Sequence, residues 1–223
     1  MKAVIRLGGS TFASPPSPEL IRRYVKVISG LREQGHELAV IVGGGSLARQ
    51  FIQFARELGL TVPEQDEVAI SVSKLYAQLL AIKLGLDWKD IPTSTKEAAR
   101  LFQSRKIVVM GGVKPGWTTD TVAASVASKI NADLIVKATD QDGVYTKDPK
   151  KHPDARKLDR ISFDELDLFL EEDKHTAGIH QIIDPEAVRI LKKRKMRTIV
   201  VNGFEPENLA AAIRGEEVGT VIQ

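Results

Sequence analysis

The sequence predicts an α/β protein, a three-layer α/β/α sandwich with a mostly parallel central sheet. Short apolar segments alternate with amphipathic helical segments along all 223 residues, which is typical of a parallel sheet covered on both faces. Three of the predicted strands end in glycine-rich turns, where a strand is joined directly to a loop or helix. Because no linker or shift in composition interrupts this pattern, we expect a single domain over residues 1–223.

Each element of the first half is predicted from apolar spacing and from the residues that end it. Gly8-Gly9-Ser10 ends the first strand, and Pro18 suits the first turn of the helix that follows a proline-bearing loop at residues 15–18. Glycines at residues 43–45 break the second strand just before another helix. In chain order we expect a strand at residues 2–7, a helix at 18–34, a strand at 37–42, and helices at 46–58 and 66–84.

The helix at residues 66–84 has a narrow apolar seam that allows two interpretations. The apolar residues follow one another in steps of four and three, and they are Val68, Val72, Leu75, Leu79 and Ile82. An ordinary helix buries such a face against its own sheet. Paired helices bury it against a second copy, as in a homodimer. The sequence leaves both interpretations open.

Glycines and helix caps also mark the second half. Gly111-Gly112 ends a strand, Asp142-Gly143 is a strong hairpin-turn signal, and Asp184 before Pro185 suits the start of a helix. In chain order we expect a strand at 106–110, a helix from about 120 to 130, a buried strand at 134–138, helices at 162–170 and 185–194, a strand at 198–201, a helix at 205–214 and a closing strand at 220–222.

Composition excludes several functional classes. No cysteine occurs, so disulfides and thiolate metal sites are excluded. The net charge is only +3 and aromatic residues make up 5%, which disfavours a nucleic-acid groove. No apolar run reaches the ~18–20 residues of a membrane span, and we expect a cytoplasmic protein. The histidines have no metal-ligand spacing, and they are His36, His152, His175 and His180.

The glycine turns predict phosphate binding. Glycines let backbone N–H groups approach an anion closely, and a helix that starts there adds its unpaired N–H groups. Three such turns at one edge of a sheet suit a ligand with several phosphates, or two phosphorylated ligands. Neither the G-x-x-x-x-G-K-[ST] loop nor the G-x-G-x-x-G fingerprint occurs, so the phosphates would be bound by another scaffold.

Three motifs together resemble the amino acid kinase superfamily: residues 7–10, residues 42–46 and the Thr-Asp-Gln-Asp-Gly-Val-Tyr-Thr-Lys-Asp-Pro segment at 139–149. The resemblance covers essentially the whole chain. The loop at residues 111–120 is similar to that of the archaeal type of uridylate (UMP) kinases, and Arg49 and residues 183–185 point the same way. The resemblance implies ATP and UMP as substrates, Mg²⁺ with the ATP, and a homo-oligomer, a hexamer built from dimers. The part before about residue 133 would bind the acceptor, and the part after it would bind ATP.

The resemblance also implies two sets of binding residues. The expected ATP-binding residues are Gly9, Ser10, Gly45, Arg49, Thr139, Asp140, Tyr145 and Asp148. The expected UMP-binding residues are Gly44, Asp66, Lys114, Pro115, Gly116, Trp117, Thr118, Thr119 and Asp120. Several have purely structural alternatives, because Asp66, Thr118, Thr119 and Asp120 also suit helix N-termini.

Phosphoryl transfer requires positive charge at the transferring group more than it requires a general base, because a phosphate acceptor is already ionised near neutral pH. Many members of the superfamily have lysine where this chain has Arg6. Arg6, Lys150 and Lys151 are therefore the candidate catalytic cations.

Other functions fit the same motifs. An enzyme of this fold could use isopentenyl phosphate, carbamate or acetylglutamate as the acceptor, although residues 47–49 lack the histidine expected of the isopentenyl phosphate type. A non-catalytic protein that binds a nucleotide or an oxyanion is the alternative from a different class.

Overall fold

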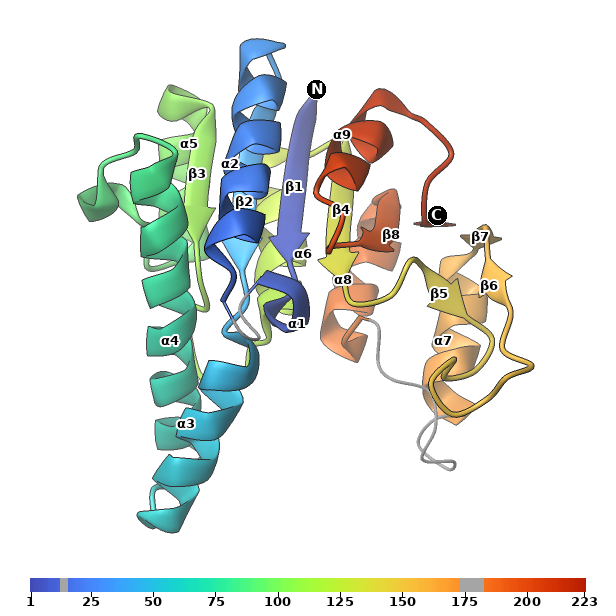
Figure 1. The fold of residues 1–223 in the computed structure, drawn as a ribbon, viewed down its shortest axis with the longest axis horizontal. Coiled ribbons are helices and arrows are strands. Elements are labelled where there is room, and N and C mark those ends of the chain that lie inside the picture. Colours follow the sequence, from blue (N-terminus) through green and yellow to red (C-terminus); the bar gives the residue numbers. More distant parts are fainter. Residues whose placement is uncertain (13–15, 173–182) are drawn as a thin grey trace.

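The computed structural model describes residues 1–12, 16–172 and 183–223 of the chain. Its centre is a seven-stranded sheet in the order β3-β2-β1-β4-β8-β9-β7 (Figure 1). The strands are β1 (Lys2–Leu7), β2 (Glu37–Val42), β3 (Ile107–Met110), β4 (Leu134–Thr139), β7 (Arg160–Ile161), β8 (Thr198–Asn202) and β9 (Thr220–Ile222). Neighbouring strands run parallel except β8 and β9, so the predicted mostly parallel sheet is confirmed.

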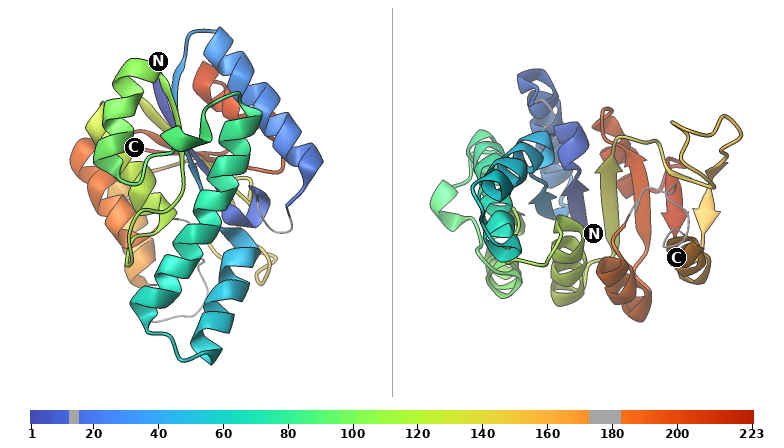
Figure 2. Two further views of the ribbon diagram at one scale, coloured as in Figure 1. Left: turned by 90° about the vertical axis from the view of Figure 1, so that its left-hand side faces the viewer. Right: turned by 90° about the horizontal axis from the view of Figure 1, so that it is seen from below.

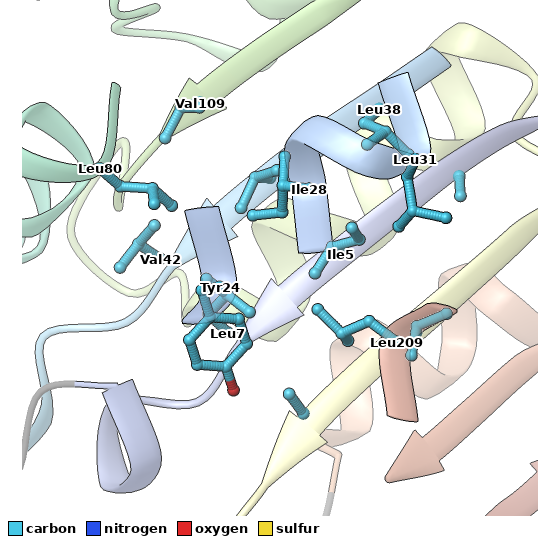
Figure 3. Packing of buried hydrophobic residues seen from close by; sticks show 14 of the residues in the cluster. Ile5, Leu7, Tyr24, Ile28, Leu31, Leu38, Val42, Leu80, Val109 and Leu209 are labelled. Carbon is cyan, nitrogen blue, oxygen red and sulfur yellow. The ribbon is translucent and has the colours of Figure 1, made fainter. Parts of the chain in front are cut away.

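Helices cover both faces of this sheet, which gives the three predicted layers (Figure 2). One face packs against α2 (Pro18–Glu33), α4 (Val62–Lys83) and α9 (Glu207–Arg214). The other packs against α5 (Thr95–Arg105), α6 (Thr119–Ile130), α7 (Phe163–Glu172) and α8 (Pro185–Arg194). Figure 3 shows the first layer, in which Tyr24 and Ile28 of α2 pack over Ile5 and Leu7 of β1.

Strand alternation decides which side chains of β1 and β4 face α6. Ile5 and Val136 belong to the core under α2, whereas Val4 and Ile135 belong to the core under α6. Successive side chains of a strand point to opposite faces. Arg6 and Lys137 therefore face the α6 layer, and they are register partners across the β1–β4 pair.

The helices α3 (Gly45–Glu57) and α4 form an antiparallel pair that extends beyond the carboxyl ends of the strands (Figure 1). On α4, Tyr76 and Leu80 are buried against the sheet. The side chains of Leu75, Leu79 and Ile82 are 49%, 48% and 52% exposed. The interpretation of the seam as an ordinary core face is therefore wrong for these three residues. It holds for Val72, which is buried.

Two predictions of local structure were wrong or incomplete. Asp142-Gly143 does not close a hairpin with β4, because β5 (Val144–Tyr145) pairs instead with β6 (Lys157–Leu158). Gly143 is required for another reason, since a Cβ there would lie 2.5 Å from Oγ1 of Thr220. No helix was expected between residues 84 and 106, yet α5 lies there and Ser94 caps it through the amide of Glu97.

The remaining short elements are α1 (Gly9–Phe12) and a 3₁₀ turn at Trp88–Asp90. The α4 helix begins four residues before the predicted start at Asp66, at Val62. Pro15, His175 and His180 lie outside the described residues, so the expectations for them stay open. Within the described ranges, no helix combines the length and the apolar character needed to cross a bilayer.

Candidate functional site

Two adjoining cavities lie at the carboxyl ends of β1, β2 and β4. The larger, of about 380 Å³, is lined by Arg6, Gly9, Ser10, Gly43, Gly44, Gly45, Arg49, Thr119, Asp120, Lys137, Thr139, Asp140, Gln141 and Lys150. The smaller, of about 160 Å³, is lined by Gly44, Ala48, Asp66, Ala69, Ile70, Ser73, Gly112, Trp117, Thr118 and Thr119. Gly44 and Thr119 line both cavities, so they mark the junction between them.

Glycines at the floor of the larger cavity allow two strand ends to approach closely. A Cβ on Gly9 would lie 2.2 Å from the amide nitrogen of Gly45, a distance that no side chain tolerates. Gly45 has a φ of +64°, in the left-handed region that favours glycine, and it starts α3. The turns after β1 and β2 thus pack backbone against backbone. This arrangement places the two glycine turns and the start of α3 at the cavity.

A buried cluster of charges lies beside the junction. Nε of Arg6 is 2.7 Å from Oδ1 of Asp120, and Nζ of Lys137 is 2.5 Å from Oδ2 of the same carboxylate. Arg6 also donates a hydrogen bond of 3.0 Å to the hydroxyl of Thr119. Asp120 lies in the first turn of α6, which places its carboxylate between the two cations that β1 and β4 present. One carboxylate therefore holds two cations at the wall of the larger cavity.

Burial determines how this cluster ionises. Burial lowers the pKa of Lys137 to about 8. The negative charge of Asp120 offsets only part of this lowering, and the positive charge of Arg6 lowers the pKa further. Burial alone would raise the pKa of Asp120, but Arg6 and Lys137 hold it below its usual value. The cluster has a formal charge of +1 while Lys137 is protonated, a surplus that an anion in the cavity would neutralise.

The expected ATP-binding residues divide into two groups. Those that line the larger cavity are Gly9, Ser10, Gly45, Arg49, Thr139 and Asp140. Tyr145 and Asp148 do not line it. The hydroxyl of Tyr145 donates to Asp142 at 2.6 Å, and buried Asp148 accepts the amide of Lys150 at 3.0 Å.

The candidate cations of the chain segment after β5 differ in position. Lys150 lines the larger cavity, and its Nζ is 3.0 Å from Oδ2 of Asp140. Lys151 lies outside the cavity lining, and its Nζ is 3.9 Å from Asp148. Of the two, Lys150 is therefore the one that borders the larger cavity.

The expected UMP-binding residues lie in or around the smaller cavity. Gly44, Asp66, Trp117, Thr118 and Thr119 line it. Lys114, Pro115 and Gly116 do not line it, but two of them contact residues that do: the amide of Gly116 donates to Asp66 at 2.8 Å, and Nζ of Lys114 lies 4.1 Å from the centre of the Trp117 ring. Asp120 was expected on this side but lines the larger cavity instead, with its carboxylate paired to the two cations.

Several lining residues were not predicted from the sequence. In the larger cavity they are Gly43, Lys137 and Gln141, and in the smaller they are Ala48, Ala69, Ile70, Ser73 and Gly112. A signal existed for Lys137, because a lysine in an otherwise apolar buried strand is rare unless it is paired. Ser73 accepts the amide of Gly112 at 2.8 Å and so joins α4 to the end of β3, a contact that no local pattern indicates.

Comparison with known proteins assigns the chain to a family. The model of the amino acid kinase family matches residues 1–202. The chain belongs to the amino acid kinase family. The predicted superfamily and fold are therefore confirmed.

Full-length relatives and solved structures of this family resemble the chain closely. The uridylate kinase of Methanocaldococcus jannaschii is 40% identical, with all of both chains covered. The uridylate kinase of Methanothermobacter thermautotrophicus is 39% identical over all of this chain and 99% of its own. The crystal structure of Archaeoglobus fulgidus uridylate kinase, at 39% identity, superposes with a TM-score of 0.90 and covers both chains fully. That of Bacillus anthracis UMP kinase, at 22% identity and a TM-score of 0.82, shares the fold.

Proposed function

We propose that this member of the amino acid kinase family is a uridylate kinase, which transfers the γ-phosphoryl group of ATP to UMP and yields ADP and UDP. The observation that carries the proposal is the meeting of two cavities at Gly44 and Thr119, beside the cations of Arg6 and Lys137. A kinase needs this arrangement, because donor and acceptor phosphates must meet in line where positive charge offsets their repulsion. The names of the full-length relatives support the same activity.

The larger cavity is assigned to ATP. Gly9 and Gly45 line this cavity, the start of α3 at Gly45 suits the phosphates, and Lys150 lies at its wall. Thr139 ends β4 and Asp140 follows it, and both suit the adenosine end, which the C-terminal part of the domain was expected to bind. Tyr145 and Asp148 lie outside the lining and would act by supporting this segment.

The smaller cavity is assigned to UMP, with its phosphate at the junction. Thr119 suits the phosphate, because it lies in the first turn of α6, where the helix dipole has its positive end. Asp66 accepts the amide of Gly116 through one oxygen, which leaves its other oxygen for ribose hydroxyls. Trp117 offers a flat wall for the base. Lys114 on the ring of Trp117 adds positive charge to this side.

The chemical step needs charge and alignment. The acceptor oxygen of UMP is ionised near neutral pH, so no residue has to remove a proton from it. Arg6 and Lys137 face the junction from adjacent strands and would stabilise negative charge on the transferring group. Asp120 keeps both cations in place, and its own charge is already neutralised by them.

The cavity also suits Mg²⁺ that arrives with ATP. Asp140 and Asp120 are the carboxylates that line the larger cavity, and no cluster of three or more metal-ligating side chains occurs in the described ranges. This fits Mg²⁺, which keeps several waters and takes one or two carboxylates together with phosphate oxygens. Asp140 is the better ligand, because one of its oxygens faces a cation, Lys150, whereas both oxygens of Asp120 do so. When bound, Mg²⁺ supplies positive charge to the phosphate oxygens.

A coupled ADP-release assay with Mg²⁺, ATP and a panel of acceptors tests the proposal. The panel contains UMP, CMP, isopentenyl phosphate, carbamate and acetylglutamate. We expect ADP formation with UMP far above that with any other acceptor. Preference for another acceptor would replace the substrate and keep the kinase. Nucleotide binding by calorimetry without ADP formation from any acceptor would favour a non-catalytic binding protein.

The exposed seam on α4 supports assembly with a second copy. Leu75, Leu79 and Ile82 are each about half exposed, and they lie on one side of a helix that projects from the body of the domain. Pairing of two such helices would bury this face, and the hexamer implied by the sequence resemblance would add further contacts between dimers. Leu75→Glu should yield a folded chain of lower mass by light scattering. An unchanged mass would remove the seam from the interface.

We also expect a cytoplasmic location, which fits these substrates.

A further inference from the structure

A carboxylate outside both cavities contacts the start of α6. Asp184 precedes α8, and its Oδ1 accepts the amide of Ala187 at 3.0 Å and the hydroxyl of Thr121 at 2.9 Å. Its Oδ2 accepts a short hydrogen bond from the hydroxyl of Thr118. Both oxygens are therefore used, and two of the three contacts reach a different helix.

Thr118 connects Asp184 to the first turn of α6 by hydrogen bonds. It is the N-cap residue, and its side-chain oxygen accepts the amides of Asp120 at 3.2 Å and of Thr121 at 3.1 Å. The two lone pairs of the hydroxyl thus serve α6, and its single hydrogen goes to Asp184. The next two residues are Thr119, which lines both cavities, and Asp120, which holds the two buried cations.

The cap of α8 does not by itself require this arrangement. One side-chain oxygen satisfies an N-cap, and Asn or Ser caps a helix about as well as Asp. The second oxygen of Asp184 has no role in α8, because it faces Thr118. Thr121 is buried, with 2% of its surface exposed, so its bond to Asp184 is shielded from competing water.

We infer that Asp184 is a positioning residue that fixes the acceptor end of the active site from the C-terminal part of the domain. It does so by holding Thr118 and Thr121, and through them the junction residue Thr119. This inference rests on the proposed kinase function for its kinetic consequences. Its structural consequence, a fixed first turn of α6, is independent of the reaction.

The test is Asp184→Asn, which keeps the size of the side chain and its ability to cap α8. The amide nitrogen cannot accept a hydrogen bond, so Thr118 or Thr121 loses its acceptor. We expect the KM for UMP to rise about tenfold and kcat to fall, because the acceptor is held less well in line. The KM for ATP should rise much less than that for UMP, because the glycine turns after β1 and β2 do not contact Asp184, and its charge is the smallest of the influences on the pKa of Lys137.

Two controls separate positioning from stability. Ser94→Ala removes the cap of α5 and should lower the melting temperature without changing either KM. Thr121→Val removes one of the two hydroxyl contacts, and in combination with Asp184→Asn its effect on the KM for UMP should be less than the product of the single effects. Hydrogen exchange of peptides spanning residues 118–122 should be faster in Asp184→Asn than in Ser94→Ala.

The outcomes are distinct. An unchanged KM for UMP with unchanged exchange at residues 118–122 would overturn the inference. So would equal rises in both KM values, which would indicate a general loss of stability. If the unmodified chain does not phosphorylate UMP, the proposed function fails, and the exchange measurement alone then decides the role of Asp184.

Discussion

Lys137 provides the sharpest test of the site, because burial lowers its pKa from the ordinary 10.5 to about 8. If its positive charge helps to bind the phosphates of ATP, kcat/KM for ATP should fall above pH 8. The fall should approach about tenfold for each further pH unit, as the protonated fraction declines. In Lys137→Arg the cation stays protonated throughout, so the fall above pH 8 should disappear even if the overall activity is lower.

The assay is ADP release at limiting ATP between pH 7.5 and 9.5, with the fold monitored by circular dichroism. The decisive quantity is the slope against pH, so a lower level of activity in the variant does not affect the conclusion. A flat profile in the unmodified chain, or the same fall in Lys137→Arg, would refute the role of the Lys137 charge.

Stability should change in the opposite direction over the same pH range. Between the lowered pKa in the folded state and the ordinary pKa in the unfolded state, the unfolded chain binds more protons, so the free energy of unfolding rises with pH. From pKa values of about 8 and 10.5, the rise from pH 7.5 to 9.5 amounts to about 2 kcal/mol relative to Lys137→Met. Urea denaturation of both proteins at the two pH values measures it. An equal response in Lys137→Met would contradict the buried position of the charge.

Three further predictions concern the neighbouring residues. Asp120→Asn leaves two buried cations without their carboxylate and should lower the free energy of unfolding by about 3 kcal/mol, measured by urea denaturation. Gly9→Ala should lower both the melting temperature and the activity, because its Cβ would lie 2.2 Å from backbone. The matched control is Gly30→Ala, where a Cβ would meet no atom within 4 Å, and it should stabilise α2 by about 0.5–1 kcal/mol. Lys150→Ala should raise the KM for ATP or lower kcat, and Lys151→Ala should do neither, so equal effects would contradict their different positions at the larger cavity.

Local sequence was sufficient for most of the architecture. Strand and helix periodicity predicted the layers, because a residue's face depends only on its spacing along its own element. The prediction of a hairpin at Asp142-Gly143 failed because a turn signal does not specify which strand becomes the partner. The apolar seam on α4 showed the opposite limit, since spacing identifies an apolar face without saying what covers it.

The glycine turns and their place at strand ends can be recognised in the sequence alone, and with them the resemblance to the amino acid kinase family that the comparison confirms. How the charges meet depends on the folded chain. Arg6 and Lys137 are 131 residues apart in the chain, and the parallel register of β1 and β4 makes them neighbours on one face of the sheet. Asp120 reaches both because α6 starts over that face. Pairing across strands and between layers depends on contacts distant in sequence, so the charge cluster beside the junction of the two cavities becomes visible only in the folded chain.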